Sequence, residues 1–256
     1  MDDVPSLLVF NEFPQELSIQ VSGSDVVLLA PNRLQDDPDP SNALPDPVEL
    51  FAAAVNQQMF PRTEPRSAPS SARILERSTQ LAQGEQTWRL RLDHAHASCL
   101  RILANLLRAR DFDSAVVRAS KPSQQAHSID PTQLAYPPAR TNLPFAVEHE
   151  EVIRALSDRL IQVEFARQPS DALYEGLSAV MELWCDLLLL GGYPPEGMHP
   201  REAGVLPEGP LLLDEVTIQL AFPEAFLADD AAFNGLLNHL CHLDPSHNPV
   251  VRVRLR

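Results

Sequence analysis

Residues 216–256 read VTIQLAFPEAFLADDAAFNGLLNHLCHLDPSHNPVVRVRLR and contain three successive patterns. In residues 216–220 apolar and polar side chains alternate, which is typical of a β-strand with one buried face. Residues 229–242 follow, with apolar side chains at the spacing of one helix face. Residues 250–253 are rich in valine, which is favoured in strands. The sequence therefore predicts a strand, an amphipathic helix and a second strand.

An earlier part of the chain repeats this pattern 134 positions upstream. The shift places residues 229–242 on a second expected helix, residues 98–110. The matched apolar residues are Phe233, Leu236, Leu237, Leu240 and Cys241 with Cys99, Ile102, Leu103, Leu106 and Leu107. The same shift carries Val250, Val251 and Arg252 onto Val116, Val117 and Arg118 without a gap. Matched phases in both helix and strand predict an internal duplication of one α+β unit.

Further segments extend both copies of the pattern. Helices are expected at residues 47–60 and 171–190, and a shift of 125 positions matches their apolar faces. Another helix is expected from about Val147, because Glu148, Glu150 and Glu151 suit the first turn of a helix. Strands are expected at residues 17–21, 26–30, 73–80, 87–93, 115–119 and 161–165, with room for a short strand at 203–206.

Each half then has the order strand, helix, strand, strand, helix, strand, which resembles the split βαβ, ferredoxin-like unit. We therefore expect an α+β protein with two tandem, internally duplicated ferredoxin-like βαββαβ units and antiparallel sheets. The first unit, with an N-terminal hairpin, is expected at residues 1–120 and the second at 147–256. Residues 121–146 are expected to link them, because they are polar and rich in proline. The likeness is architectural, and a fold alone does not give a function.

The composition is that of a globular protein found in the cytoplasm. Of the 256 residues, 44% are hydrophobic and 21% are charged, which excludes a disordered chain. No apolar run approaches the roughly 20 residues of a transmembrane helix, and the acidic start, Met1-Asp2-Asp3, is unlike a signal peptide. The net charge of −15 lies mostly in residues 129–256, with 19 acids against 8 Lys and Arg. Such a charge repels phosphate groups, so neither nucleic acid nor a membrane is an expected partner.

The sequence lacks the common motifs of cofactor sites. The phosphate-loop, dinucleotide and common hydrolase patterns do not occur, so no cofactor is expected. The three cysteines, Cys99, Cys185 and Cys241, all fall in expected helices and none forms a C-x-x-C pair. They are expected to be buried free thiols.

Two groups of histidines are candidates for chemistry. His239 and His242 lie about 60° apart on a helix, and His247 follows in a loop, so together they form a weak candidate metal site. The preferred alternative is that they are solvated histidines near a helix C-terminus, so no bound metal is predicted. Asp93, His94 and His96 lie between an expected strand and helix. They suit a general base with its partner or a metal site, although Asp and Ser near a helix start are ordinary caps.

The expected helix 171–190 is apolar almost all round near its end, where it carries Leu183, Leu187, Leu189 and Leu190. These leucines are predicted to contact a protein partner or a second copy of the chain. The C-terminal arginines, which alternate at 252, 254 and 256, are expected to protect an edge strand, with pairing to acidic neighbours as the alternative.

The function expected from these features is non-enzymatic: a protein-interaction or adaptor protein with an acidic surface and an exposed sheet face or edge. The alternative is an enzyme of the dimeric α+β barrel kind, which would bind a small molecule or cofactor near His94 and His96.

Overall fold

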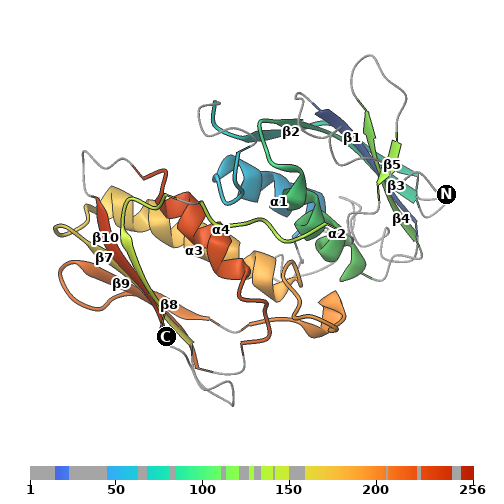
Figure 1. Ribbon diagram of the computed structural model, residues 1–256. Coiled ribbons are helices and arrows are strands. Elements are labelled where there is room, and N and C mark those ends of the chain that lie inside the picture. The colour runs from blue at the N-terminus through green and yellow to red at the C-terminus, as the bar shows by residue number, and fades with distance from the viewer. Residues whose placement is uncertain are drawn as a thin grey trace, which may run out of the picture. The chain divides into compact units, whose positions relative to one another are not determined.

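The computed structural model divides the chain into two compact units, Met1–Pro137 and Pro138–Arg256. In each of them helices pack against a β-sheet (Figure 1), so the protein is of the α+β class. The boundary between the units falls within the expected linker, residues 121–146. The structure describes residues 15–22, 45–62, 68–80, 85–110, 114–120, 127–129, 134–140, 142–149, 159–205, 207–223, 226–243 and 249–256.

Unit 1 is built on an antiparallel sheet. In chain order its elements are β1 (Gln15–Ser22), α1 (Pro47–Asn56), β2 (Ser71–Gln80), β3 (Glu85–Asp93), η6 (Ala97–Cys99), α2 (Leu100–Arg108), β4 (Ser114–Ser120) and β5 (His127–Ile129). Strands β2, β3 and β1 lie side by side, and β4 and β5 continue the sheet in the order β2-β3-β1-β4-β5. The strand expected at residues 26–30 lies outside the described residues.

The core of unit 1 follows from alternation along β3. Trp88, Leu90 and Leu92 are buried, whereas the arginines between them are exposed, as the sequence predicts. Leu17 of β1 lies opposite Leu90, and Ile19 lies opposite Trp88, so two neighbouring strands bury the same face. The buried side chains of α2 include Ile102, Leu103, Leu106 and Leu107.

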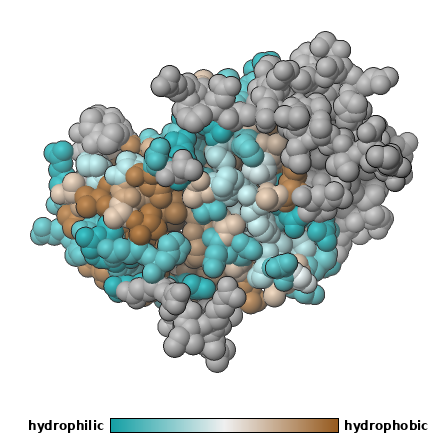
Figure 2. Space-filling view, in the orientation of Figure 1, coloured by the Kyte–Doolittle hydropathy of each residue, from teal (hydrophilic) through white to brown (hydrophobic). Residues whose placement is uncertain are grey.

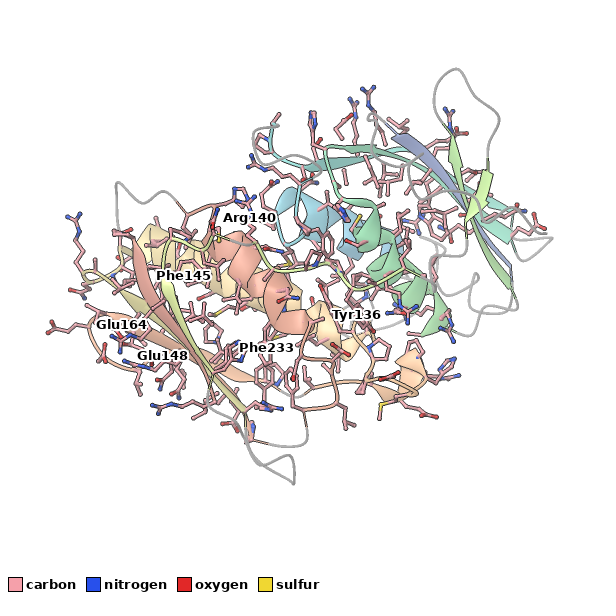
Figure 3. The ribbon with its side chains drawn as sticks, viewed as in Figure 1. Tyr136, Arg140, Phe145, Glu148, Glu164 and Phe233 are labelled. Carbon is pink, nitrogen blue, oxygen red and sulfur yellow. The ribbon has the colours of Figure 1, made fainter. Side chains whose placement is uncertain are left out.

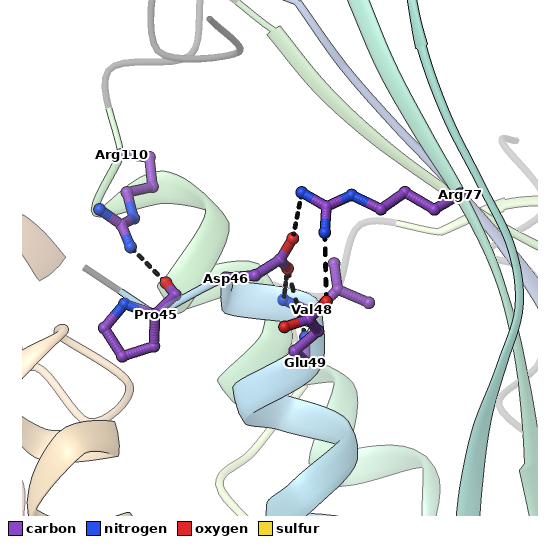
Figure 4. Close-up of polar contacts among 6 residues, drawn as sticks. All are labelled: Pro45, Asp46, Val48, Glu49, Arg77 and Arg110. Carbon is purple, nitrogen blue, oxygen red and sulfur yellow. Dashed lines mark hydrogen bonds and ion pairs between the residues drawn. The ribbon is translucent and has the colours of Figure 1, made fainter. Parts of the chain in front are cut away.

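Helix α1 starts at a capping residue that also holds an ion pair. The Oδ1 atom of Asp46 accepts hydrogen bonds from the amides of Val48 at 2.8 Å and Glu49 at 3.2 Å (Figure 4). Its Oδ2 atom lies 3.3 Å from Nη2 of Arg77 on β2, and Nη1 of Arg77 lies 3.1 Å from the Glu49 carboxylate. One carboxylate therefore satisfies two orphan amides of the helix and ties α1 to the sheet.

We expect Asp46→Ala to lower the free energy of unfolding of unit 1 by about 1–2 kcal/mol, because both capping hydrogen bonds are lost. Asp46→Asn keeps a side-chain oxygen that caps the helix and removes only the ion pair, so its loss should be less than half as large. Chemical denaturation of the full chain measures both variants. Equal losses would show that the ion pair with Arg77, and not the cap, carries the effect.

Unit 2 is built on a mixed five-stranded sheet. In chain order its elements are β6 (Ala146–His149), β7 (Arg159–Phe165), α3 (Asp171–Leu189), η8 (Pro200–Glu202), β8 (Glu208–Leu212), β9 (Thr217–Phe222), α4 (Ala232–Leu240) and β10 (Val250–Leu255). The strand order is β6-β10-β7-β9-β8, and only the β6–β10 pair is parallel among the described strands. Both helices lie against one face of this sheet (Figure 1).

Two sequence predictions for unit 2 are wrong. Residues 146–149 form the strand β6 and not the start of a helix, because Val147 pairs with Val253 in a parallel ladder. The short strand expected at residues 203–206 is replaced by a single bridge between Gly204 and Leu227, and the strand β8 follows at Glu208–Leu212. In unit 1 the short strand β5 was not predicted, because residues 121–146 were expected to be a linker. The described helices and the other described strands lie within a few residues of their expected positions.

The two units share one strand order when β5 and β6 are set aside. In unit 1 the order is β2-β3-β1-β4, and in unit 2 it is β8-β9-β7-β10. In both, the second strand of the unit lies at one edge, followed by the third, the first and the fourth, and helices follow the first and third strands. Ile102 of α2 and Leu236 of α4, which the shift of 134 positions matches, are both buried.

The gap-free match does not extend through the last strands. Val117 of β4 pairs with Ile19, whereas Val251 is left out of the ladder at a β-bulge between Val250 and Arg252 and is 42% exposed. The bulge inserts one residue into β10, so Val250 before it and Val253 and Leu255 after it are buried, whereas Val251 is exposed.

Candidate functional site

The segment that carries Asp93, His94 and His96 joins β3 to η6. His96 caps this short helix, because its Nδ1 atom accepts the Ser98 amide at 3.2 Å and lies 2.7 Å from the Ser98 hydroxyl oxygen. The Oδ1 atom of Asp93 lies 3.3 Å from Nε of Arg91. The structure therefore brings Ser98, and not Asp93, to Nδ1 of His96.

The main chain around His94 is fixed by local contacts. His94 has a φ of 59°, which is uncommon for a non-glycine residue, and its carbonyl oxygen accepts a hydrogen bond from the Ser70 hydroxyl at 3.2 Å. The amide of His96 donates to the Pro61 carbonyl at 3.0 Å. These hydrogen bonds hold the connection between β3 and η6 against Pro61 and Ser70, which lie between α1 and β2.

The capping contact fixes the protonation of His96. A ring nitrogen that accepts an amide hydrogen carries no proton, so the neutral ring has its hydrogen on Nε2. Burial lowers the pKa of His96, which also favours the neutral ring. The sequence predicted Asp or Ser as the cap at this position, and the structure shows His96 in that role; His199 caps η8 in unit 2 in the same way.

We expect His96→Ala to lower the free energy of unfolding by about 1 kcal/mol at pH 7.5, because the capping hydrogen bond is lost. His96→Asn should retain most of the stabilisation by the cap, because asparagine is a good N-cap. The folded protein disfavours the protonated ring, so the stabilisation by His96 is complete above its ordinary pKa and declines as the pH falls below about 6.5. The difference between the wild-type protein and His96→Ala should therefore narrow at pH 5.5. A gap that widens at low pH would show that His96 is bound as a cation.

The histidines of the C-terminal helix have separate environments. His239 is buried in α4, whereas His242 follows the helix and its Nε2 atom is hydrogen-bonded to Nη2 of Arg140. A nitrogen that accepts from a guanidinium is occupied and cannot also bind a metal ion. His247 lies outside the described residues, and within the described ones no group of three or more His, Cys, Asp and Glu is arranged to hold a metal.

All three cysteines are free thiols. Cys99 and Cys185 are buried and Cys241 is half-buried, and burial raises the pKa of each thiol, to about 12 for Cys185. The expectation of buried free thiols is confirmed for Cys99 and Cys185, whereas Cys241 is free but only half-buried. The raised pKa values make these thiols poor nucleophiles.

Two buried asparagines, which sequence reasoning missed, hold the segment that connects the units. In unit 1, Nδ2 of Asn105 donates to Oη of Tyr136 at 3.3 Å, and the Arg101 guanidinium lies 5.5 Å from the centre of the Tyr136 ring. In unit 2, Oδ1 of Asn238 accepts the Arg140 amide at 3.0 Å and its Nδ2 donates to the Pro138 carbonyl at 3.2 Å. Tyr136 and Arg140 are labelled in Figure 3. Both asparagines have 0% exposure, so Tyr136 and residues 138–140 are each bound to a helix of their own unit.

The four leucines predicted as an interface differ in their exposure. Leu187 is in the core at 0%, Leu183 and Leu190 are half-buried, and Leu189 is 47% exposed. Helix α3 packs against the sheet and α4, so part of its apolar surface is already buried within the chain. Apolar side chains are nevertheless visible on unit 2 over β10, α3 and α4 (Figure 2).

A different group of leucines is more exposed. Leu211, Leu212 and Leu213 are consecutive and have exposures of 59%, 47% and 54%. They lie on and directly after β8, the edge strand of the second sheet. We call residues 211–213 the leucine edge. Three adjacent leucines show no alternation, so the sequence predicted no strand at residues 211–213.

The leucine edge presents side chains on both faces of the sheet. Leu212 lies opposite Ile218, a core residue, so it points to the face that carries the helices. Leu211 lies opposite Gln219, and the Leu213 amide donates to the Thr217 carbonyl at 2.8 Å. By the alternation of a strand, these two leucines point to the outer face, which the helices do not cover.

The outer face of the second sheet carries a balanced ion-pair network. Nε of Arg254 lies 3.1 Å from Oε2 of Glu148, and its Nη2 lies 3.1 Å from Oε2 of Glu164. Arg252 lies 3.3 Å from Glu148. Glu148 and Glu164 point away from the helices, whereas Phe233 lies on their side (Figure 3). The expectation that these arginines protect an edge strand is wrong, because β10 lies between β6 and β7.

An acidic turn ends the leucine edge. Asp214 follows Leu213, and its carboxylate accepts the Val216 amide at 2.8 Å. That hydrogen bond, with contributions from Thr217 and the charge of Arg254, lowers the pKa of Asp214. Asp214 therefore stays ionised beside the exposed leucines.

Comparison of the chain with protein-family models, with curated proteins and with solved structures found no match in any of the three. Within the described residues, no helix is long and apolar enough to span a bilayer.

Proposed function

We propose that this protein is a non-enzymatic protein-interaction or adaptor protein that binds a protein partner, or a second copy of itself, through unit 2. The observation that carries the proposal is the leucine edge, in which three adjacent leucines are each about half exposed. Water-exposed apolar side chains are stabilised when a partner covers them, and clustered ones mark interfaces in soluble proteins.

Leu189 contributes to a second exposed apolar group on the same unit. A Cβ atom at Gly204 would lie 4.0 Å from Cδ1 of Leu189, and the amide of Gly204 donates to the Leu227 carbonyl at 3.1 Å. Leu227 is 39% exposed. Of the four leucines predicted on α3, Leu189 has the exposure that a contact residue needs, so the proposed interface combines it with the leucine edge.

We further propose that both units are ferredoxin-like and descend from one duplicated unit. The shared strand order, the equal placement of the helices and the matched helix residues Ile102 and Leu236 support this. The three free thiols support a reducing compartment such as the cytoplasm.

The alternative, an enzyme of the dimeric α+β barrel kind that uses His94 and His96, has less support. Nδ1 of His96 is engaged by Ser98, and Asp93 is paired with Arg91. A general base needs a ring nitrogen with a free lone pair; in His96 Nδ1 accepts the Ser98 amide and Nε2 carries the hydrogen of the neutral ring.

The proposal is tested with full-length protein purified from its native host at low and moderate salt. A specific partner, or a dimer seen by light scattering, should be present with the wild-type protein and lost with Leu211→Ser/Leu213→Ser. Leu75→Ser is the matched control, because Leu75 is 40% exposed on β2, the corresponding edge strand of unit 1. A strictly monomeric protein without a captured partner, or a complex that survives the double substitution, would refute the proposal.

A further inference from the structure

We infer that the leucine edge binds a basic, apolar protein segment, and that it does so through side chains and not by adding a strand to the sheet. This inference rests on the proposed function and specifies the partner and the mode of binding.

The outward main chain of β8 is mostly blocked. Residues of an edge strand alternate between groups that bond to the neighbouring strand and groups that point outward. The Leu213 amide bonds to Thr217 of β9, so the outward positions are Leu212 and Pro210. Pro210 has no amide hydrogen, and its carbonyl oxygen accepts a hydrogen bond from Oη of Tyr174 at 3.0 Å. A strand added here would find one residue to pair with, which is too few for β-augmentation.

In unit 1 the start of the corresponding edge strand, β2, is covered by hydrogen bonds from side chains. Asn56 forms two hydrogen bonds with the main chain of Ala72, to the carbonyl at 3.1 Å and from the amide at 2.8 Å. Gln58 does the same with Ser70, at 2.6 and 3.0 Å. Two side-chain amides thus take the place of a neighbouring strand at the start of β2. The start of β2 is thus protected against strand addition, as β8 is in unit 2, but of these two edges only that of β8 has three adjacent exposed leucines.

The charge around the leucine edge selects a basic partner. Residues 202–251 contain eight Asp and Glu and no Lys or Arg. Glu208, Asp214 and Glu215 are exposed at the two ends of the leucine edge. Asp171 and Glu175 are exposed in the same turn of α3 as Tyr174, which reaches Pro210. Lysine or arginine beside apolar residues would complement this surface, because opposite charges steer association and like charges oppose it.

Two arginines on the same face are largely balanced by other carboxylates. Arg252 and Arg254 are paired with Glu148 and Glu164, and the charge of Arg254 also acts on Asp214, which leaves the other acids at the leucine edge without a paired arginine among these two. A second copy of the chain would bring the same acidic surface to the contact and be repelled. Self-association through the leucine edge is therefore disfavoured relative to a basic partner.

The test uses the full chain and three labelled synthetic peptides of equal length, composed of Lys and Leu, of Glu and Leu, or of Lys and Ser. Fluorescence anisotropy should show binding of the Lys/Leu peptide, with both other peptides at least about tenfold weaker, since affinity needs both burial and complementary charge. Leu211→Ser/Leu213→Ser should lower the affinity for the Lys/Leu peptide about tenfold or more, as expected for central contact residues. Leu75→Ser should leave this affinity unchanged.

Separate variants and a modified peptide test the role of the acidic residues at the leucine edge and the binding through side chains. Glu208→Gln/Glu215→Gln should lower the affinity for the Lys/Leu peptide about three- to tenfold at low salt. The difference in affinity between this variant and the wild-type protein should shrink as salt screens the charges. Glu49→Gln/Glu76→Gln, a pair of exposed acids in unit 1, should have no effect. A Lys/Leu peptide with N-methyl groups at alternate amides, which cannot pair as a strand, should bind within about threefold of the unmodified peptide, since no ladder is formed.

The outcomes separate this inference from the proposed function. Equal binding of the Glu/Leu peptide, or loss of binding on N-methylation, would overturn the basic partner or the side-chain mode. If no peptide binds while a native complex still depends on Leu211 and Leu213, the inference is wrong and the proposed function stands. If the native complex is also insensitive to these leucines, both are wrong.

Discussion

Leu103→Ala and Leu237→Ala are each expected to lower the free energy of unfolding of their own unit by about 2–5 kcal/mol. Leu103 of α2 has 0% exposure and Leu237 of α4 has 4%. Truncation of either side chain removes buried methyl groups and leaves a cavity that the packed surroundings fill only in part. The effect should be similar in the two units, because each leucine lies in the helix that precedes its unit's fourth strand.

The two tryptophans allow the units to be followed separately. Trp88 lies in the core of unit 1 and Trp184 in the core of unit 2, and the chain has no others. In a Trp184→Phe background, fluorescence reports unit 1, and the transition should shift with Leu103→Ala. In a Trp88→Phe background, it reports unit 2 and should shift with Leu237→Ala. This separation matters because a chain with two units need not unfold in one step.

Leu189→Ala is the control for these truncations. Its side chain is 47% exposed, so the change should stay within about 0.5 kcal/mol. Near-zero effects of Leu103→Ala or Leu237→Ala would show that the helix faces are assigned wrongly. A loss that appears equally in both tryptophan signals would show instead that the two units unfold together.

Local patterns in the sequence were sufficient for the regular parts of the fold. The alternation along β3 placed Trp88, Leu90 and Leu92 in the core because a strand repeats every two residues. Helix α3 was predicted at residues 171–190 and observed at Asp171–Leu189, since Ser170 caps its start and the glycines at 191 and 192 follow its end. These features depend on residues that are close in the sequence, so local sequence patterns were sufficient to predict them.

Features that depend on distant partners were not predicted. Glu148 suits the first turn of a helix, but in β6 it pairs with Arg252 and Arg254, more than a hundred residues away. The strand β8 has no alternation and exists because it pairs with β9. The same holds for Asn105 and Asn238, whose burial depends on hydrogen bonds to Tyr136 and to residues 138–140.

The candidate site was predicted only in outline. The sequence indicated an acidic second half and an exposed sheet edge or face as the place of contact. It assigned the contact to the leucines of α3, of which Leu187 is fully buried. Helical periodicity identifies an apolar surface but not which part the neighbouring sheet covers, so exposure had to come from the packing. For His96 the sequence offered catalysis or metal binding, with Asp or Ser as the expected cap, whereas in the structure His96 itself accepts the Ser98 amide as the cap.

Phe233→Ala is expected to lower the free energy of unfolding of unit 2 by about 3–5 kcal/mol. Phe233 is 5% exposed, and its ring centre lies 6.0 Å from that of Trp184 and 5.4 Å from that of Phe226, with which it is stacked. Phe226 also contacts Phe222 edge to face at 5.1 Å. Removal of the central ring therefore breaks two aromatic contacts and opens a cavity between α3 and α4.

Phe226→Ala should be less harmful, at about 1–3 kcal/mol, because Phe226 is only half-buried. The double variant should lose less than the sum of the single losses, by about 0.5–1.5 kcal/mol, since an aromatic pair in contact has a coupling of that size. Urea denaturation in the Trp88→Phe background measures all three, because Trp184 remains the reporter. Strict additivity would show that the two rings do not stabilise each other, and a small effect of Phe233→Ala would place that ring outside the core.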